Sequence, residues 1–231
     1  MTPLSHRRHL AGAGVLLVAL LAWDNTSLDM VLAAWFGGPA GFPLKEHWLF
    51  TEVLHEGARA ASWLFLLALC VMVWWPAGAF RRIDIQRRLQ VVVTTLLAVL
   101  AVSGLKSFSR TSCPWDLAAF GRVAQHISHW AWATSDGGPG RCFPAGHASA
   151  GFGFLGGYFA FAERSPRLAK AWLAAALLAG LLLGIAQQAR GAHFMSHTLW
   201  TAWICWCIAL GVDALRELSW PGCVPEVGDA A

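Results

Sequence analysis

Residues 89–107 read LQVVVTTLLAVLAVSGLKS, an apolar run whose single charged residue, Lys106, stands near its end. A helix needs roughly 20 consecutive apolar residues to cross a bilayer, and this run has that length. Because the apolar residues are continuous, the run predicts a helix and not a strand of a transmembrane barrel. Comparable runs occupy approximately residues 10–30, 57–78, 146–163, 168–188 and 196–215. The pattern predicts an all-α integral membrane protein, a six-transmembrane-helix bundle formed as a single domain over residues 1–231.

The composition is typical of a protein that is solvated by lipid. Hydrophobic residues make up 57% of the chain and charged residues 13%, whereas a soluble domain carries about 25% charged residues. An ordinary cytosolic enzyme and a disordered chain are therefore excluded. The net charge of +4 comes from no basic block, so we expect the lipid bilayer as a partner and no nucleic acid. The first run resembles the apolar region of a signal peptide, but no small-residue cleavage site follows, and we expect it to be retained.

Positive residues in the loops predict the orientation of the bundle. Lys and Arg are in excess on the cytoplasmic side of membrane proteins, and two arginine pairs fall on the side that carries the N-terminus. This side holds Arg7, Arg8, Arg81, Arg82, Arg87, Arg88, Arg164, Arg167, Lys170 and Arg216. The other side holds Lys45, Arg59, Lys106, Arg110, Arg122, Arg141 and Arg190. We therefore expect cytoplasmic N- and C-termini, with residues 219–231 as a cytoplasmic tail.

Ionisable residues from three expected spans gather at the opposite face. The group consists of Lys106, Arg110, His147, Arg190, His193 and His197. Each residue alone fits a snorkelling cation or an interfacial histidine, but ionisable residues gathered at one membrane face indicate a functional site. Basic side chains can bind a phosphate, and two histidines can attack phosphorus and protonate the leaving oxygen. The group therefore predicts phosphoryl transfer.

Three motifs within this group resemble those of the type 2 phosphatidic acid phosphatases, the PAP2 family, many of which are membrane lipid phosphatases. The family motifs are K-x6-R-P, P-S-G-H and S-R-x5-H-x3-D. The matching residues here are Lys106 with Cys113-Pro114, then Pro144-Ala145-Gly146-His147, and then Ala186-Gln187 with His193 and His197. The motifs follow the family's order, and the six-helix layout places them at the membrane face that the family uses for its active site.

Several motif positions differ from the family pattern. Cys113 replaces an Arg, Ala145 a Ser, Ala186-Gln187 the Ser-Arg pair, and His197 the final Asp. Arg110 follows Lys106 by one helical turn and Arg190 follows Gln187 by three residues, so each is expected to bind the phosphate in place of a missing arginine. The lost Ser hydroxyl can be replaced by backbone N–H groups, here those of Ala145 and Gly146 at the start of a span, or by Thr111 or Ser112.

The resemblance also assigns roles to the histidines. His193 would be the nucleophile that forms a phosphohistidine, and His147 the general acid. His197 would stand where the family has the Asp that orients the nucleophile, with Asp116 as another candidate for the missing carboxylate. The three histidines also match a zinc site, but the surrounding positive groups disfavour a cation. The family analogy implies that no metal or other cofactor is needed.

Two of the six cysteines stand beside motif prolines on the expected outer side. If that side is an oxidising periplasm, we expect a disulfide between Cys113 and Cys142. The alternative is a pair of free thiols. A bond would fix the first motif against the second and stabilise the fold by roughly 3–4 kcal/mol in the chain-entropy model.

Together these observations lead us to expect a bacterial inner-membrane lipid phosphatase that hydrolyses a phosphomonoester or a pyrophosphate on the periplasmic side. The resemblance implies four candidate substrates: undecaprenyl pyrophosphate, phosphatidylglycerol phosphate, phosphatidic acid and lipid A 1-phosphate. A lipid phosphotransferase that uses the same histidine is one alternative. A non-catalytic anionic-lipid binder or transporter is another, although transport would favour polar residues at mid-membrane. We expect a monomer or a homodimer.

Overall fold

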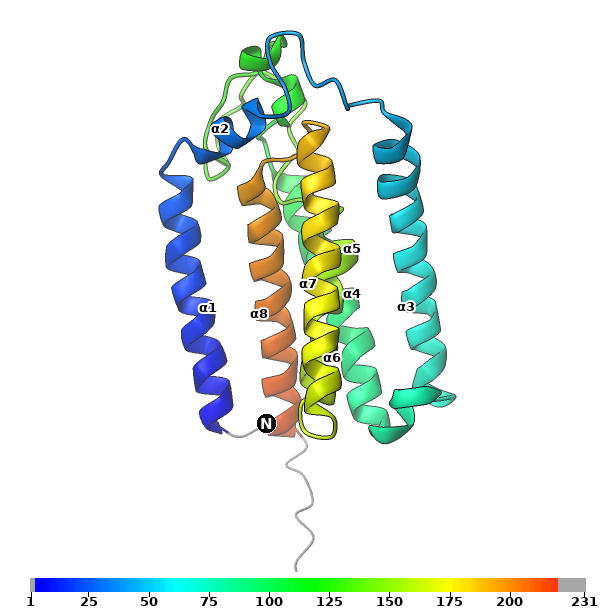
Figure 1. Ribbon diagram of the computed structural model, residues 1–231. Helices are drawn as coiled ribbons and strands as arrows, with labels where there is room; N and C mark the ends of the chain where they lie inside the picture. The colour runs from blue at the N-terminus through cyan, green and yellow to red at the C-terminus, as the bar shows by residue number, and fades with distance from the viewer. Residues whose placement is uncertain (1–2, 220–231) are drawn as a thin grey trace, which may run out of the picture.

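The computed structural model describes residues 3–219 as a bundle of helices that stand side by side (Figure 1). The long helices are α1 (Pro3–Asp24), α3 (Ala58–Trp74), α4 (Ile85–Phe108), α7 (Pro166–Ala189) and α8 (Met195–Ser219). The short ones are α2 (Leu28–Ala34), η1 (Leu49–Gly57), η2 (Gly78–Arg82), η3 (Pro114–Asp116), η4 (Ala118–Phe120), α5 (Ser149–Phe152), η5 (Gly153–Leu155) and α6 (Gly156–Phe161). The proposed tail falls on residues 220–231, outside the described residues, apart from its first residue.

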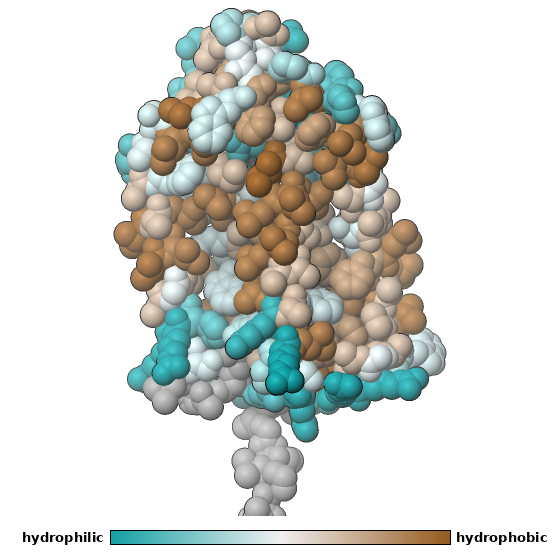
Figure 2. Space-filling view, viewed as in Figure 1, coloured by the Kyte–Doolittle hydropathy of each residue, from teal (hydrophilic) through white to brown (hydrophobic). Residues whose placement is uncertain are grey.

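Four helical segments are long and apolar enough to cross a membrane. They are Leu49–Arg82, Ile85–Phe108, Pro166–Ala189 and Met195–Leu218. A fifth is added if α1 and α2, which meet at a bend of 70°, are counted as one broken span. Figure 2 shows an apolar belt between hydrophilic rims at the two ends of the bundle. The chain therefore has the architecture of an all-helical membrane protein with four or five candidate spans.

Two of the six expected spans differ in the structure. The run over 146–163 forms three successive pieces, α5, η5 and α6, which cover only residues 149–161. At 1.5 Å per residue they extend about 20 Å, less than the hydrocarbon core of a bilayer. The first run ends at Asp24 because Asn25 and Thr26 bond back to the carbonyls of Leu21 and Trp23, which stops the helix.

Helix α8 stands at the centre of the packing and contacts α1, α4, α6 and α7. Its N-terminal end is held by Asp29 of α2, whose carboxylate accepts from the backbone N–H of Ser196 (3.0 Å) and from the Ser196 hydroxyl. Near its other end, Asp213 is fully buried and pairs with Arg87 of α4 at 2.6 Å. Arg87, expected in a cytoplasmic loop, is thus a buried partner that fastens α4 to α8.

Close helix packing also fixes the piece that leads away from His147. Gly151 of α5 lies so near α7 that a Cβ there would stand 2.2 Å from the backbone nitrogen of Gly180. Small residues permit such contact between helices in membranes. Because α5 follows His147 directly, this contact sets the position of that histidine.

A layer of loops covers the end of the bundle away from the N-terminus (Figure 1). It is built from the connection between α2 and η1 and from the long connection between α4 and α5. Phe42, Leu117 and Phe120 of these segments form a small core with Phe194 from the loop between α7 and α8. The core anchors the loops over the ends of α4, α7 and α8, where the candidate site lies.

Candidate active site

Three separate segments bring the predicted histidines and Lys106 together. Lys106 lies in the last turn of α4, and a Cβ built on Gly146 would stand 3.6 Å from its Nζ. The turn before α5 is tied to α8, because Ala145 donates its backbone N–H to the His197 carbonyl (3.2 Å) and accepts from the Thr201 hydroxyl (3.1 Å). The first two motifs and the start of α8 therefore meet at one point.

His193 lies in the loop between α7 and α8 and is 2% exposed. Its Nδ1 is 3.5 Å from Sγ of Cys142, and its ring centre is 5.8 Å from that of His197. Burial, followed by the positive charge of Lys106, lowers the pKa of His193 well below its usual value. The ring is therefore neutral at physiological pH. Since Nδ1 faces Cys142, Nε2 is the ring nitrogen on the other side of His193.

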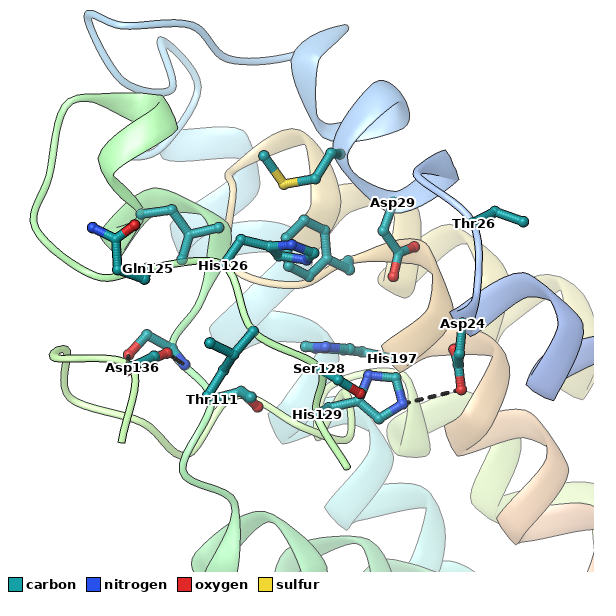
Figure 3. Close-up of a pocket in the computed structure, with 15 residues that line it drawn as sticks. Asp24, Thr26, Asp29, Thr111, Gln125, His126, Ser128, His129, Asp136 and His197 are labelled. Atoms are coloured by element: carbon teal, nitrogen blue, oxygen red, sulfur yellow. Dashed lines mark hydrogen bonds and ion pairs between the residues drawn. The ribbon is translucent and has the colours of Figure 1, made fainter. Parts of the chain in front are cut away.

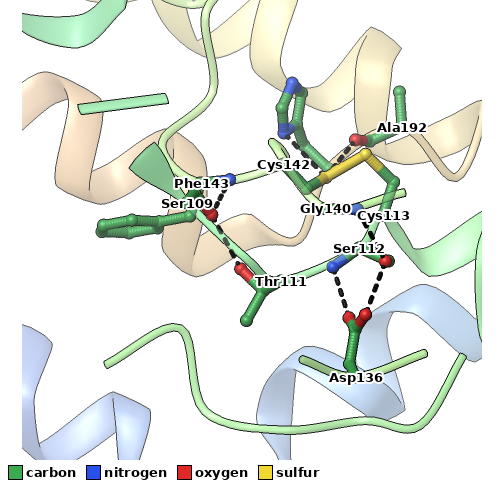
Figure 4. The surroundings of a disulfide bond; sticks show 10 residues. Ser109, Thr111, Ser112, Cys113, Asp136, Gly140, Cys142, Phe143 and Ala192 are labelled. Atoms are coloured by element: carbon green, nitrogen blue, oxygen red, sulfur yellow. Dashed lines mark hydrogen bonds between the residues drawn. A yellow bond between two sulfur atoms is a disulfide. The ribbon is translucent and has the colours of Figure 1, made fainter. Parts of the chain in front are cut away.

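The structure contains the expected disulfide between Cys113 and Cys142, with the Cα atoms 5.1 Å apart (Figure 4). Asp136 braces the same loop by accepting from both the backbone N–H and the hydroxyl of Ser112. Sγ of Cys142 also lies 3.0 Å from the Ala192 carbonyl oxygen. The bond thus joins the first and second motifs directly beside the loop that carries His193.

His147 lies at the mouth of the turn and stacks on His55 of η1, with ring centres 3.6 Å apart. Burial, then the charges of His55, Lys106 and Arg190, lowers the pKa of His147 to about 3. Its Nε2 is buried, and no group within residues 3–219 bonds to it. The ring is therefore a neutral group with one ring nitrogen free for a substrate atom.

The two arginines that were expected to bind the phosphate have different surroundings in the structure. Arg190 is buried and anchored, donating from Nε to the Lys45 carbonyl (2.9 Å) and from its guanidinium to Gln187 (3.2 Å). Its charge acts on His147, so it lies within electrostatic reach of the site. Arg110 is exposed, and within residues 3–219 its side chain makes no hydrogen bond or ion pair. The helical spacing does not place it over Lys106, because α4 ends at Phe108 and the chain then turns extended.

The two backbone N–H groups that were expected to bind the phosphate also differ. The N–H of Ala145 is already used by the His197 carbonyl. Gly146, beside the Lys106 ammonium, is the position where a phosphate would meet both an N–H group and a positive charge.

A metal site is not formed by the three histidines. Among residues 3–219, the ligand atoms that cluster at this end belong to Cys142, His193 and His197. His147 is not part of that cluster, and the Cys142 sulfur is bonded to Cys113 and offers no thiolate. This leaves two imidazoles, fewer than the three or four protein ligands of a typical zinc site.

Sequence reasoning missed several residues around the histidines. His55 stacks on His147, and the ring of His129 meets the ring of His197 edge to face at 5.6 Å. Asp24, at the end of α1, accepts from His129 at 3.2 Å. No spacing rule could find these pairs, because 68 to 105 positions separate the partners. Asp116 lies in η3, where its backbone groups bond to Cys113 and Ala124.

Comparison with known proteins decides the family. A family model described as the PAP2 superfamily matches residues 87–219, more than half of the chain, and includes all three motifs. The chain belongs to the PAP2 superfamily. No curated protein and no solved structure matches it. Membership implies phosphatase-type hydrolysis of a phosphoester, often a membrane lipid. The PAP2 protein described here keeps the motif lysine and both motif histidines, although other motif positions have changed.

Proposed function

We propose that this PAP2 protein hydrolyses a phosphate ester or pyrophosphate of a membrane lipid through a phosphohistidine at His193. The observation that carries the proposal is an apolar cavity of about 230 Å³ that opens between α3 and α4 and reaches Gly146 and His147. Its apolar wall includes Trp63, Leu66, Val99 and Phe154. A cavity of this kind accommodates a hydrocarbon chain. It therefore favours a phosphate ester of a lipid over a soluble phosphate ester, which has no such chain.

The two histidines divide the reaction between them. In the first step, Nε2 of His193 attacks phosphorus and the bond from phosphorus to the leaving oxygen breaks, while His147 donates a proton to that oxygen. In the second step, a water oxygen attacks the phosphohistidine, the phosphorus–nitrogen bond breaks, and His147 accepts the proton of the water. One water is consumed, inorganic phosphate is released, and both histidines return to their starting state.

The low pKa of His147 in the empty site is compatible with this role. The positive neighbours that depress it also attract an anionic headgroup. A bound phosphate places negative charge beside the ring, which favours the imidazolium and raises the pKa of His147. Lys106 and Arg190 then stabilise the charge on the phosphoryl oxygens. Under this proposal His147 becomes an acid when substrate binds, and no metal ion takes part.

The first experiment measures phosphate release by the purified protein in detergent with EDTA. The four candidate lipids are offered to wild type, to His193→Ala and to His47→Ala, which removes an exposed histidine at the same end of the bundle. We expect release by wild type and by His47→Ala, and a loss of several powers of ten in His193→Ala. An alkaline quench with radiolabelled substrate should trap phosphate on wild type and not on His193→Ala.

Three outcomes would contradict the proposal. A His193→Ala protein with a near-normal rate would remove the nucleophile. Loss of activity in EDTA that zinc restores would overturn the metal-independent mechanism. Lipid binding without phosphate release from any of the four lipids would favour the non-catalytic binder.

A further inference from the structure

The two histidines at the centre of the site are His193 and His197, and within residues 3–219 neither is hydrogen-bonded to a carboxylate. His197 is 2% exposed, and its Nδ1 is a buried atom that bonds to no group within residues 3–219. Such an unpaired polar atom is costly unless water or another group satisfies it. His197 also lines a small cavity whose lining residues do not include His193.

Asp24 lines the same cavity from the end of α1 (Figure 3). Its side chain is 5% exposed, and Oδ2 accepts from the ring N–H groups of His129 (3.2 Å), Trp130 (2.9 Å) and Trp200 (3.0 Å). Its other oxygen, Oδ1, is buried without a partner among the described residues. One carboxylate thus has an oxygen that is saturated and an oxygen that is free.

His129 connects this carboxylate to the site. Its ring stacks on Phe143 with centres 4.1 Å apart and planes 8° from parallel, and its edge meets His197 at 5.6 Å. The stacked ring cannot turn while Nε2 bonds to Asp24. The cavity, about 40 Å³, has room for water, which needs about 10–15 Å³ and two or more polar partners. Asp24 and His197 both line this cavity, and each has a buried polar atom, Oδ1 and Nδ1, without a partner among the described residues.

We propose that Asp24, through His129 and water in this cavity, is the positioning carboxylate of the His197–His193 pair. The proposal rests on the function proposed above. A carboxylate held behind buried imidazoles favours positive charge on them, and such charge develops as His193 bonds to phosphorus. The titratable and charged groups that face His197 are Lys106, His126, His129 and His193, with Asp29 and Asp136 also on the cavity wall.

Asp29 provides a matched control. Its carboxylate lines the same cavity and also accepts three hydrogen bonds, from Trp23 and from two groups of Ser196. It holds α8 and acts electrostatically on His126, but among the described residues it forms no hydrogen bond or ion pair with His129. Asp24→Asn and Asp29→Asn each remove one charge and keep an acceptor oxygen and the side-chain shape. A difference between the two variants therefore reports the link to the histidines and not the loss of a buried charge alone.

The test compares kcat, KM and the pH profile of the two variants. For Asp24→Asn we expect kcat to fall at least about tenfold, KM to stay within about twofold, and the acidic limb of kcat/KM to move to lower pH. For Asp29→Asn we expect a lower melting temperature with kcat and the acidic limb unchanged. Equal kinetic losses in both variants, or an Asp24→Asn protein with the wild-type kcat and acidic limb, would overturn the proposal.

Two further measurements keep the test decisive. If Asp24→Asn does not fold, His129→Gln breaks the same link and leaves Asp24 with its two tryptophan donors, and we expect the same kinetic change. If wild type releases no phosphate, the proposed function fails, and the link is tested by NMR of ¹⁵N-labelled histidine, with the His197 signal assigned from His197→Gln. At a fixed pH of 7, Asp24→Asn should shift the ring ¹⁵N signals of His197 and Asp29→Asn should leave them unchanged. Unchanged His197 signals in Asp24→Asn would overturn the proposal.

Discussion

His147 couples the pH of the solution to the stability of the fold. Its pKa is about 3 in the folded protein, against about 6.5 in an unfolded chain. Between these values the unfolded chain binds more protons than the folded one, so the free energy of unfolding decreases as the pH falls through this window. We expect the melting temperature in detergent to drop less between pH 7.5 and pH 4.5 in His147→Gln than in wild type. His47→Gln, which alters an exposed ring, should behave as wild type; an equal drop in all three proteins would contradict the prediction.

Arg110 and Arg190 are each expected to bind the phosphate in place of a different motif arginine, and the structure separates them. Arg190 is buried, anchored by Lys45 and Gln187, and acts electrostatically on His147, whereas Arg110 is exposed beyond the end of α4. We expect Arg190→Ala to lower kcat/KM by about 100-fold or more, equivalent to about 3 kcal/mol of transition-state stabilisation. Arg110→Ala should change it by less than about tenfold. The reverse order in the same phosphate-release assay would return the phosphate-binding role to Arg110.

The residues of the site differ in how far the sequence could predict them. Lys106, His147 and His193 follow from motif spacing and from the ends of apolar runs. The prediction that Arg110 lies one helical turn above Lys106 was wrong, because α4 ends at Phe108. Asp24 could not be found, since its contact with His129 is made across 105 positions by a loop without periodicity.

At the scale of the elements, the close approach of α5 and α7 supports the turn that carries His147. A Cβ on Gly180 would stand 2.3 Å from the ring of Phe152, whereas a Cβ on Gly211 of α8 would meet nothing within 4 Å. We expect Gly180→Ala to destabilise the protein by about 1–3 kcal/mol through overpacking. Gly211→Ala should be neutral or stabilising, because alanine favours a helix more than glycine does. Melting temperatures in detergent compare the two variants, and a Gly180→Ala protein as stable as Gly211→Ala would show that the helices can separate freely.

The elements themselves were predictable to unequal degrees. Long apolar runs predicted α3, α4, α7 and α8, because their hydrophobic length exceeds what a soluble helix needs. The run over 146–163 is also largely apolar, but Gly153, Gly156 and Gly157 fall inside it, and glycine weakens a helix. There the chain forms three short pieces that pack against α4, α7 and α8. Hydropathy measures how apolar a segment is and does not measure how the backbone of that segment breaks.

For the whole molecule, the disulfide and the loop charges bear on the same question, namely which end of the bundle faces an oxidising compartment. The Cys113–Cys142 bond lies at the end that holds the site, and disulfides persist outside the reducing cytosol. The connection between α3 and α4, with Arg81 and Arg82, lies at the other end (Figure 1), and such residues favour the cytoplasmic side. Both observations support a site that faces away from the cytoplasm.

Labelling with a membrane-impermeant maleimide tests this orientation on the full protein. Ala133→Cys places an exposed thiol in the loop layer over the site, and Arg82→Cys places an exposed thiol at the opposite end. Wild type gives the background, since Cys70, Cys205 and Cys207 are free among the described residues and Cys223 lies outside them. In intact bacterial cells whose outer membrane admits the reagent, we expect Ala133→Cys to be labelled at once and Arg82→Cys only after the inner membrane is permeabilised. Labelling of Arg82→Cys alone in intact cells would invert the orientation, and a disulfide beside the nucleophile would then have to persist in a reducing compartment.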